Sequence, residues 1–159
     1  MQFISPTRGR MNLDELCNDI IGFIKEDDKS EYTLIIGTDS QPGNNVCFVT
    51  AIIIYRKGKG ARYYYRRFFN KKVNSLRQRI VMEATYSLDV ANQVYEIISQ
   101  KGYEYMNVEI HLDVGEKGKT RDIVKEVVSM VTGCGFLPHV KPDAYGASKV
   151  ADKHSKYAI

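Results

Sequence analysis

Two carboxylates of this chain directly follow apolar, β-prone runs. Asp39 comes at the end of "TLIIGTD", and Asp113 comes at the end of "VEIHLD". Ligands of open α/β sheets tend to bind beyond the carboxyl ends of parallel strands, so two such neighbouring strands would bring both carboxylates to one edge of the sheet. One Asp alone is more typical of a turn cap, but the pair predicts a site.

A third acid, Glu83, falls on the apolar stripe of a predicted helix. It follows Ile80 by three residues and precedes Ser87 by four, which is the spacing of side chains on one helix face. A carboxylate that faces a sheet is costly unless it is paired, protonated or bound to a metal. In the alternative interpretation, Ala84 packs at this position and Glu83 lies on the rim near Arg79.

The C-terminal segment "ASKVADKHSK" offers a fourth acid. Asp152 follows Ser148 by four residues, so the two share a helix face; otherwise Asp152 is a solvated surface residue. Asp143, which lies between Pro142 and Ala144, is the other C-terminal candidate and is more typical of a helix cap.

The elements that must position these acids follow from hydrophobic periodicity and from turn and capping signals. Helices are predicted over 12–27, 75–101 and 120–132, with a last one running towards residue 154. Strands are predicted over 33–39, 46–56, 61–69, 107–114 and 136–142. Short turns join the first three strands, which makes them antiparallel, and strands separated by a helix need a crossover and pair in parallel.

The predicted fold is therefore a mixed five-stranded α/β sheet with flanking helices and an extra N-terminal helix. A chain of 159 residues suits one domain, 1–159, in which 1–30 forms an N-terminal arm and helix. The longest apolar run, Val46–Tyr55, is too short to span a bilayer, and the N-terminus lacks the order of a signal peptide. Three widely spaced cysteines without a CxxC motif fit a reduced, cytoplasmic setting.

The stretch Tyr55–Lys72 has eight Lys or Arg residues and no acid, and tyrosines and phenylalanines are interleaved with them. Cations for phosphates and rings for bases are what a nucleic-acid surface needs, and the net charge of +4 permits such a partner. The alternative is an edge strand whose basic face blocks aggregation. The candidate contacts are Arg62, Arg66 and Arg67.

The loop "DVGEKGKT" follows a strand and precedes a helix, as a phosphate-binding loop does. A Walker A motif would need Gly where Asp113 stands, so a true P-loop is not expected. The backbone amides before Thr120 remain suited to a substrate phosphate, and Lys119 is the candidate side chain there.

The histidines and cysteines add less. His111 shares a strand face with Asp113 and is either a supporting partner of the site or a satisfied core histidine. Cys134 and His139 have ligand atoms for a metal, but the sequence indicates no further ligands beside them.

Acids at the end of the first strand, on the long helix, at the end of the fourth strand and in the C-terminal helix make the arrangement of RNase H-like proteins. The segments "IGTDSQ", "SLRQRIVMEATYSLDVA", "HLDVGEKGKT" and "KPDAYGASKVADKHSK" resemble the YkuK family, a group of bacterial RNase H-like proteins. The resemblance covers nearly the whole chain.

This resemblance implies a metal-dependent nuclease that acts on DNA or RNA with Mg²⁺ or Mn²⁺. The carboxylates of the superfamily bind two divalent cations that flank the scissile phosphate. By position, Asp39 would bridge both metals, Glu83 and Asp113 would hold one each, and Asp152 would complete the second site, with His154 near the leaving group. The alternative is a nucleic-acid-binding module that keeps the fold without useful activity.

Overall fold

A computed structural model of the chain describes residues 1–71, 73, 75–115, 118, 120–141 and 150. Within these residues, seven strands form one mixed sheet in the order β2-β1-β5-β4-β3-β6-β7. The strands are β1 (Gln2–Ser5), β2 (Gly9–Asn12), β3 (Tyr32–Gln41), β4 (Asn45–Arg56), β5 (Ala61–Lys71), β6 (Asn107–Gly115) and β7 (Leu137–Lys141). The helices are α1 (Leu13–Glu26), α2 (Leu76–Ile98) and α3 (Val124–Gly133), with a π turn η1 (Ser99–Tyr103) and a 3-10 turn η2 (Arg121–Ile123).

The five-stranded prediction is wrong in its count, because an N-terminal hairpin adds two strands. β1 and β2 pair antiparallel, and β1 joins the sheet through Ile4, which pairs with Tyr65 of β5. Each strand has only four residues, which is too short for alternation to stand out in the sequence. The hairpin nevertheless contributes to the core, since Phe3 is fully buried.

The predicted starts of the first two helices are confirmed by their caps, whereas the third helix, predicted from residue 120, begins at Val124 after the turn η2. Asn12 Oδ1 accepts a hydrogen bond from the Glu15 N–H at 2.8 Å, and Glu15 Oε1 accepts one from the Asn12 N–H at 3.1 Å, which completes a capping box. Ser75 Oγ accepts from the Gln78 N–H at 3.0 Å. None of the helices in the described part of the chain combines the length and apolar character that a membrane span requires.

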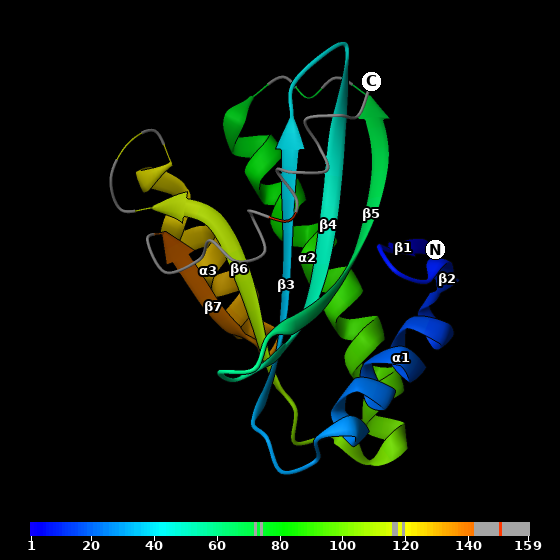
Figure 1. Ribbon diagram of the computed structural model, residues 1–159. Coiled ribbons are helices and arrows are strands. Elements are labelled where there is room, and N and C mark those ends of the chain that lie inside the picture. The colour runs from blue at the N-terminus through cyan, green and yellow to red at the C-terminus, as the bar shows by residue number, and fades with distance from the viewer. Residues whose placement is uncertain (72, 74, 116–117, 119, 142–149, 151–159) are drawn as a thin grey trace.

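The sheet topology has the predicted mixture of directions. β3, β4 and β5 form an antiparallel meander, whereas β3–β6 and β6–β7 are parallel pairs joined by crossovers. Alternate residues of the central strands, such as Leu34, Ile36 and Ile110, pack with all three helices in a single core. The helices therefore lie on one face of the sheet, behind it in Figure 1.

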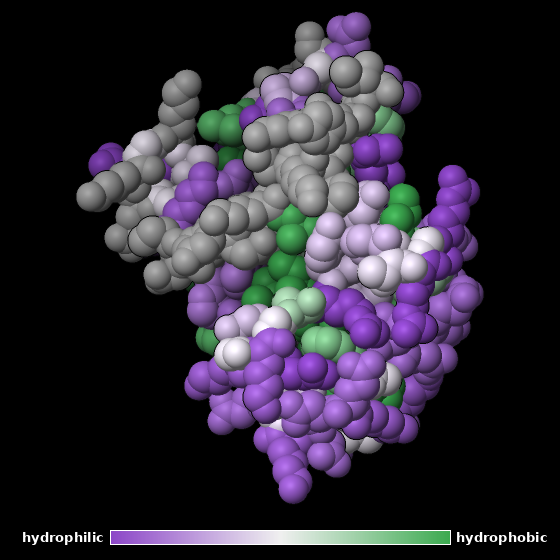
Figure 2. Space-filling view, viewed as in Figure 1, coloured by the Kyte–Doolittle hydropathy of each residue, from purple (hydrophilic) through white to green (hydrophobic). Residues whose placement is uncertain are grey.

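The sheet face turned away from α1, α2 and α3 is called the second face here. It carries the residues that alternate with the core positions, among them Asp39, Asp113 and His111. In the space-filling view, apolar side chains gather along the middle of this face, and hydrophilic side chains crowd its lower end (Figure 2).

Candidate functional site

Asp39 and Asp113 occupy matched positions on neighbouring parallel strands. The parallel ladder of β3 and β6 runs to the pair Gly37 and His111. Each Asp comes two residues beyond that pair, on the second face, at the carboxyl ends where the two strands stop pairing. Both residues are half-buried. The two strands are thus parallel neighbours, which is the condition under which the sequence would bring the two carboxylates level with each other.

Glu83 projects from α2 towards the carboxyl ends of β3 and β6, on the helix side of the sheet. Its side chain is buried, with 7% exposure, and it accepts a hydrogen bond from Ser40 Oγ. Glu83 and Asp113 also line one narrow space between α2 and the strands. The alternative of a rim-exposed glutamate is therefore wrong, although Ala84 is buried as well.

The spacing of helix and strand explains how Glu83 reaches this edge. A buried hydroxyl network joins Thr38 Oγ1 to Ser87 Oγ at 2.8 Å and to Thr50 Oγ1 at 2.9 Å. Four residues of helix rise about 6 Å, and two residues of strand rise about 6.6 Å. One turn from Ser87, Glu83 therefore meets Ser40, which lies two residues along β3 from Thr38.

The surroundings of Glu83 change its acidity strongly. The pKa of Glu83 is raised to about 8: burial is the largest cause and the charges of Asp39 and Asp113 contribute, whereas the Ser40 hydrogen bond and Arg79 oppose the rise. The three predicted carboxylates are thus close enough to influence one another. Without a bound cation, Glu83 therefore keeps its proton to a higher pH than an ordinary glutamate does.

Lys141, which the sequence did not single out, faces this group of acids from β7. Its Nζ lies 2.5 Å from Asp113 Oδ1. The hydrogen bond to Asp113 is the main reason why the pKa of Lys141 is raised, and the charges of Asp39 and Glu83 add to it. As the last residue of the strand next to β6, Lys141 lies at the edge where the acids gather, and only the sheet order would have revealed this.

The structure does not describe the other predicted site residues of the C-terminal half. Asp152, its alternative Asp143, His154 and Lys119 all lie outside the described residues. The fourth carboxylate and the loop lysine therefore remain predictions.

The basic stretch is divided between the two faces of the sheet. Arg62 lies on the helix side, where its guanidinium is 3.2 Å from Asp19 Oδ2 and 4.8 Å from the centroid of the Phe23 ring. The Arg66 guanidinium lies 4.4 Å from the centroid of the Phe68 ring.

Arg67 alternates with these residues and lies on the second face. It pairs with Val49 of β4, which pairs with Asp39 of β3, so Arg67 and Asp39 share one row across the sheet. Burial raises the pKa of the Cys47 thiol, and Arg67 and Asp39 act on it in opposite directions, which places both charges near Cys47.

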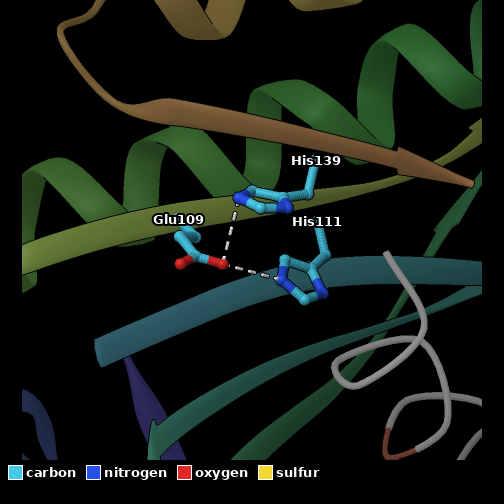
Figure 3. A group of neighbouring side chains, drawn as sticks. All are labelled: Glu109, His111 and His139. Atoms are coloured by element: carbon cyan, nitrogen blue, oxygen red, sulfur yellow. Dashed lines mark hydrogen bonds and ion pairs between the residues drawn. The ribbon is translucent and has the colours of Figure 1, made fainter. Parts of the chain in front are cut away.

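A second polar group lies lower on the same face. Glu109 and His111 of β6 meet His139 of β7, and their side chains point towards one another (Figure 3). His139 was a candidate ligand without partners in the sequence. The pairing of His111 with His139 across the parallel ladder supplies them.

Comparison with known proteins agrees with this architecture. The model of the Ribonuclease H-like family matches residues 15–156, so the chain belongs to that family. It is 29% identical over 167 aligned residues to "Uncharacterized protein YkuK" of Bacillus subtilis (strain 168), an alignment that covers 97% of this chain and 96% of that protein. The chain is therefore a YkuK-like member of the family, as the sequence motifs imply. No solved structure matches it closely enough to count as a relative.

Proposed function

We propose that this protein is a divalent-metal-dependent nuclease that hydrolyses phosphodiester bonds of DNA or RNA at Asp39, Glu83 and Asp113. The main support is the position of Glu83, which is buried beside Asp113 at the end of the parallel pair β3 and β6 and whose pKa both aspartates help to raise. A fold that holds a buried carboxylate beside two further acids has a strong electrostatic preference for a cation there.

The donor set fits Mg²⁺ or Mn²⁺, because both ions prefer carboxylate oxygens. Asp39 and Asp113 are the half-buried ligands in this proposal, and Glu83 gives up its proton when the site is filled. Bound ions would lower the pKa of a water molecule and stabilise the leaving oxygen. Asp152 remains the proposed fourth ligand, and Asp143 its alternative.

The proposed substrate contacts lie beside these acids. Arg67 shares a row of the second face with Asp39, and the exposed Phe69 and Lys71 continue along β5. A guanidinium and an ammonium suit phosphates, and an exposed ring suits a base. Lys119 stays a proposed phosphate contact.

The second candidate function is a nucleic-acid-binding module without useful activity. The contact of 2.5 Å between Lys141 Nζ and Asp113 Oδ1 favours it, because an ammonium group already balances part of the acidic charge. In that case the acids and Lys141 stabilise the fold, and Arg67 still contributes to binding.

Asp39→Asn tests the nuclease, since it keeps the side-chain shape and removes the charge. The parent and the variant would be incubated with DNA, RNA and hybrid duplexes in Mg²⁺, Mn²⁺ or a chelator. Asp89→Asn is the matched control, because Asp89 is an exposed acid on α2.

We expect metal-dependent cleavage that Asp39→Asn lowers by orders of magnitude and Asp89→Asn leaves unchanged. Cleavage by the parent in chelator, or full activity of Asp39→Asn, would contradict the mechanism. A parent that binds nucleic acid but cleaves none of these substrates would favour the binding module.

A further inference from the structure

Three side chains on the second face gather around one point without belonging to the carboxylate site. Glu109 Oε1 lies 3.3 Å from His111 Nε2 and 3.2 Å from His139 Nε2. The two imidazole rings are 5.4 Å apart between centroids and tilted by 32°. Figure 3 shows both rings turning a nitrogen towards the same carboxylate oxygen.

The strand pairing fixes this arrangement. His111 and His139 are direct partners in the parallel ladder of β6 and β7, so their side chains leave the sheet side by side. Glu109 precedes His111 by two residues and therefore shares its face. The exposed fractions of the side chains are 17% for Glu109, 7% for His111 and 31% for His139, so the first two are held by their surroundings.

The separations match those that a bound metal imposes on its ligands. A tetrahedral zinc ion with bonds of about 2.0–2.1 Å holds neighbouring ligand atoms about 3.3 Å apart. Both separations between Glu109 and the imidazole nitrogens have this length. The ligand atoms of all three residues lie within 4.8 Å of one another. A small rotation of the more exposed His139 would therefore bring its ligand nitrogen to the same distance from that of His111.

Neither imidazole has a better partner among the described residues. His111 Nδ1 is buried and has no hydrogen-bond partner there, and both rings share one carboxylate oxygen. A neutral imidazole keeps a lone pair on one of its two ring nitrogens. A neutral imidazole beside a carboxylate is the form that binds a metal.

We infer that Glu109, His111 and His139 form a binding site for a transition-metal ion such as Zn²⁺, Co²⁺ or Fe²⁺, separate from the proposed nuclease site. Two imidazoles and one carboxylate select these ions, whereas Mg²⁺ prefers oxygen ligands alone. Three protein ligands leave coordination positions open, as in metal sites that bind a further ligand.

A cavity beside the site provides room for such a ligand. Its volume is about 750 Å³, and Glu109 lines it together with Thr33, Ile35, Tyr55 and Tyr105. Small-molecule sites commonly have volumes of about 300–1,000 Å³ and combine apolar walls with a few polar groups. Of the three proposed ligands, Glu109 lines this cavity, so its carboxylate would link the metal to a space large enough for a small molecule.

Co²⁺ titration of the metal-free protein tests the site, because Co²⁺ held by nitrogen and oxygen ligands absorbs visible light. In millimolar Mg²⁺, which competes for the carboxylate site, we expect one Co²⁺ per chain that Zn²⁺ displaces. Loss of a residue that only orients a metal ligand weakens metal binding by roughly 10–100-fold. His139→Gln and Glu109→Gln should each weaken Co²⁺ binding by more than this, because each removes a ligand. Thermal unfolding in chelator checks that His139→Gln, a change at a partly exposed position, folds like the parent.

Three matched variants separate this site from other Co²⁺ ligands of the chain. Cys134→Ser removes the exposed thiol, His154→Gln removes the third histidine, and Asp39→Asn alters the carboxylate site. All three should bind Co²⁺ like the parent. Absence of stoichiometric binding, unchanged binding by His139→Gln and Glu109→Gln, or loss of binding in Cys134→Ser or His154→Gln would each overturn the inference.

Discussion

Two regions of β6 offer different metal ligands, and the elements beside each region determine which ligands are present. Towards its carboxyl end, Asp113 lies near acids from β3 and α2, which offer carboxylate oxygens as metal ligands. Nearer the middle of the strand, Glu109 and His111 meet His139 of β7, which adds nitrogen donors. Glu109 and Asp113 are four residues, or about 13 Å, apart along the strand. One strand can therefore serve two ligand sets with different metal preferences.

The largest expected effects come from a crossed experiment, in which one variant of each site is measured both for cleavage and for Co²⁺ binding. Asp113→Asn should lower Mg²⁺-dependent cleavage by roughly 10³-fold, because several kcal/mol of transition-state stabilisation depend on the held ions. The same variant should leave Co²⁺ binding unchanged. His139→Gln should have the opposite pattern. Cleavage rates and Co²⁺ absorption, measured on the same preparations, check both outcomes.

The same crossed experiment can also show that the two regions form a single site. If His139→Gln lowers cleavage as strongly as Asp113→Asn does, the imidazoles belong to the nuclease site. If Asp113→Asn removes Co²⁺ binding, the metal lies with the acids instead of at Glu109. The two regions are separate sites only if Asp113→Asn affects cleavage alone and His139→Gln affects Co²⁺ binding alone.

A second contrast concerns the basic stretch, where single substitutions should change nucleic-acid affinity by about tenfold. Arg67→Ala should weaken nucleic-acid binding and reduce the slope of log K against log salt by about 1, because one phosphate contact is lost. Arg62→Ala should leave that slope unchanged, since Arg62 is held by Asp19 and Phe23 on the helix side. Fluorescence anisotropy at several salt concentrations measures both slopes.

Arg62→Ala serves as the matched control in this pair because it removes the same charge from the same strand. Its expected effect is on stability, with a loss of about 1–3 kcal/mol as the buried Asp19 carboxylate loses a partner. Equal salt slopes for the two variants would mean that the division of β5 between two faces does not govern binding.

The sequence predicted most of what local patterns control. The caps at Asn12 and Ser75 were found because residue spacing alone encodes them, and the mixture of antiparallel and parallel strands followed from the kinds of connection between them. The helical spacing of Glu83 from Ile80 and Ser87 indicated a buried acid, but only the packing of α2 on β3 excluded the rim.

Features that depend on long-range register were missed. His139 meets His111 only through the ladder between β6 and β7, and Lys141 reaches Asp113 for the same reason. These pairs are separated by 28 residues of chain in each case, and no local pattern specifies which residues of two strands lie opposite each other. The N-terminal hairpin was missed because four residues are too few to show alternation.

The stability of the acid cluster should depend on pH in a way that separates Glu83 from ordinary surface acids. The pKa of Glu83 is about 8 in the folded chain against an ordinary value of 4.5. The folded state therefore binds more protons than the unfolded state between these values, so this contribution is complete below pH 4.5 and is lost as the pH rises through 8. Relative to Glu83→Gln, the metal-free parent should lose roughly 1–3 kcal/mol between about pH 6 and 9.

Urea unfolding at several pH values in chelator measures this difference. Glu96→Gln is the control, because Glu96 is an exposed acid on the same helix and should show the pH dependence of the parent. Added Mg²⁺ should restore stability to the parent at high pH but not to Glu83→Gln. Parallel pH profiles of the parent and Glu83→Gln would show that Glu83 titrates like a solvated acid.

The smallest expected effect concerns the coupling between Asp39 and Glu83. The charge of Asp39 is one of the causes that raise the pKa of Glu83, although burial is the larger one. Asp39→Asn should therefore lower the pKa of Glu83 modestly and leave the metal-free protein at least as stable as the parent, because mutual repulsion among the acids decreases. Carboxyl carbon shifts measured by NMR across the titration give the Glu83 pKa directly. A Glu83 pKa that is unchanged in Asp39→Asn, or a metal-free variant that is clearly less stable than the parent, would mean that Asp39 supports the fold instead of adding to a strained group of acids.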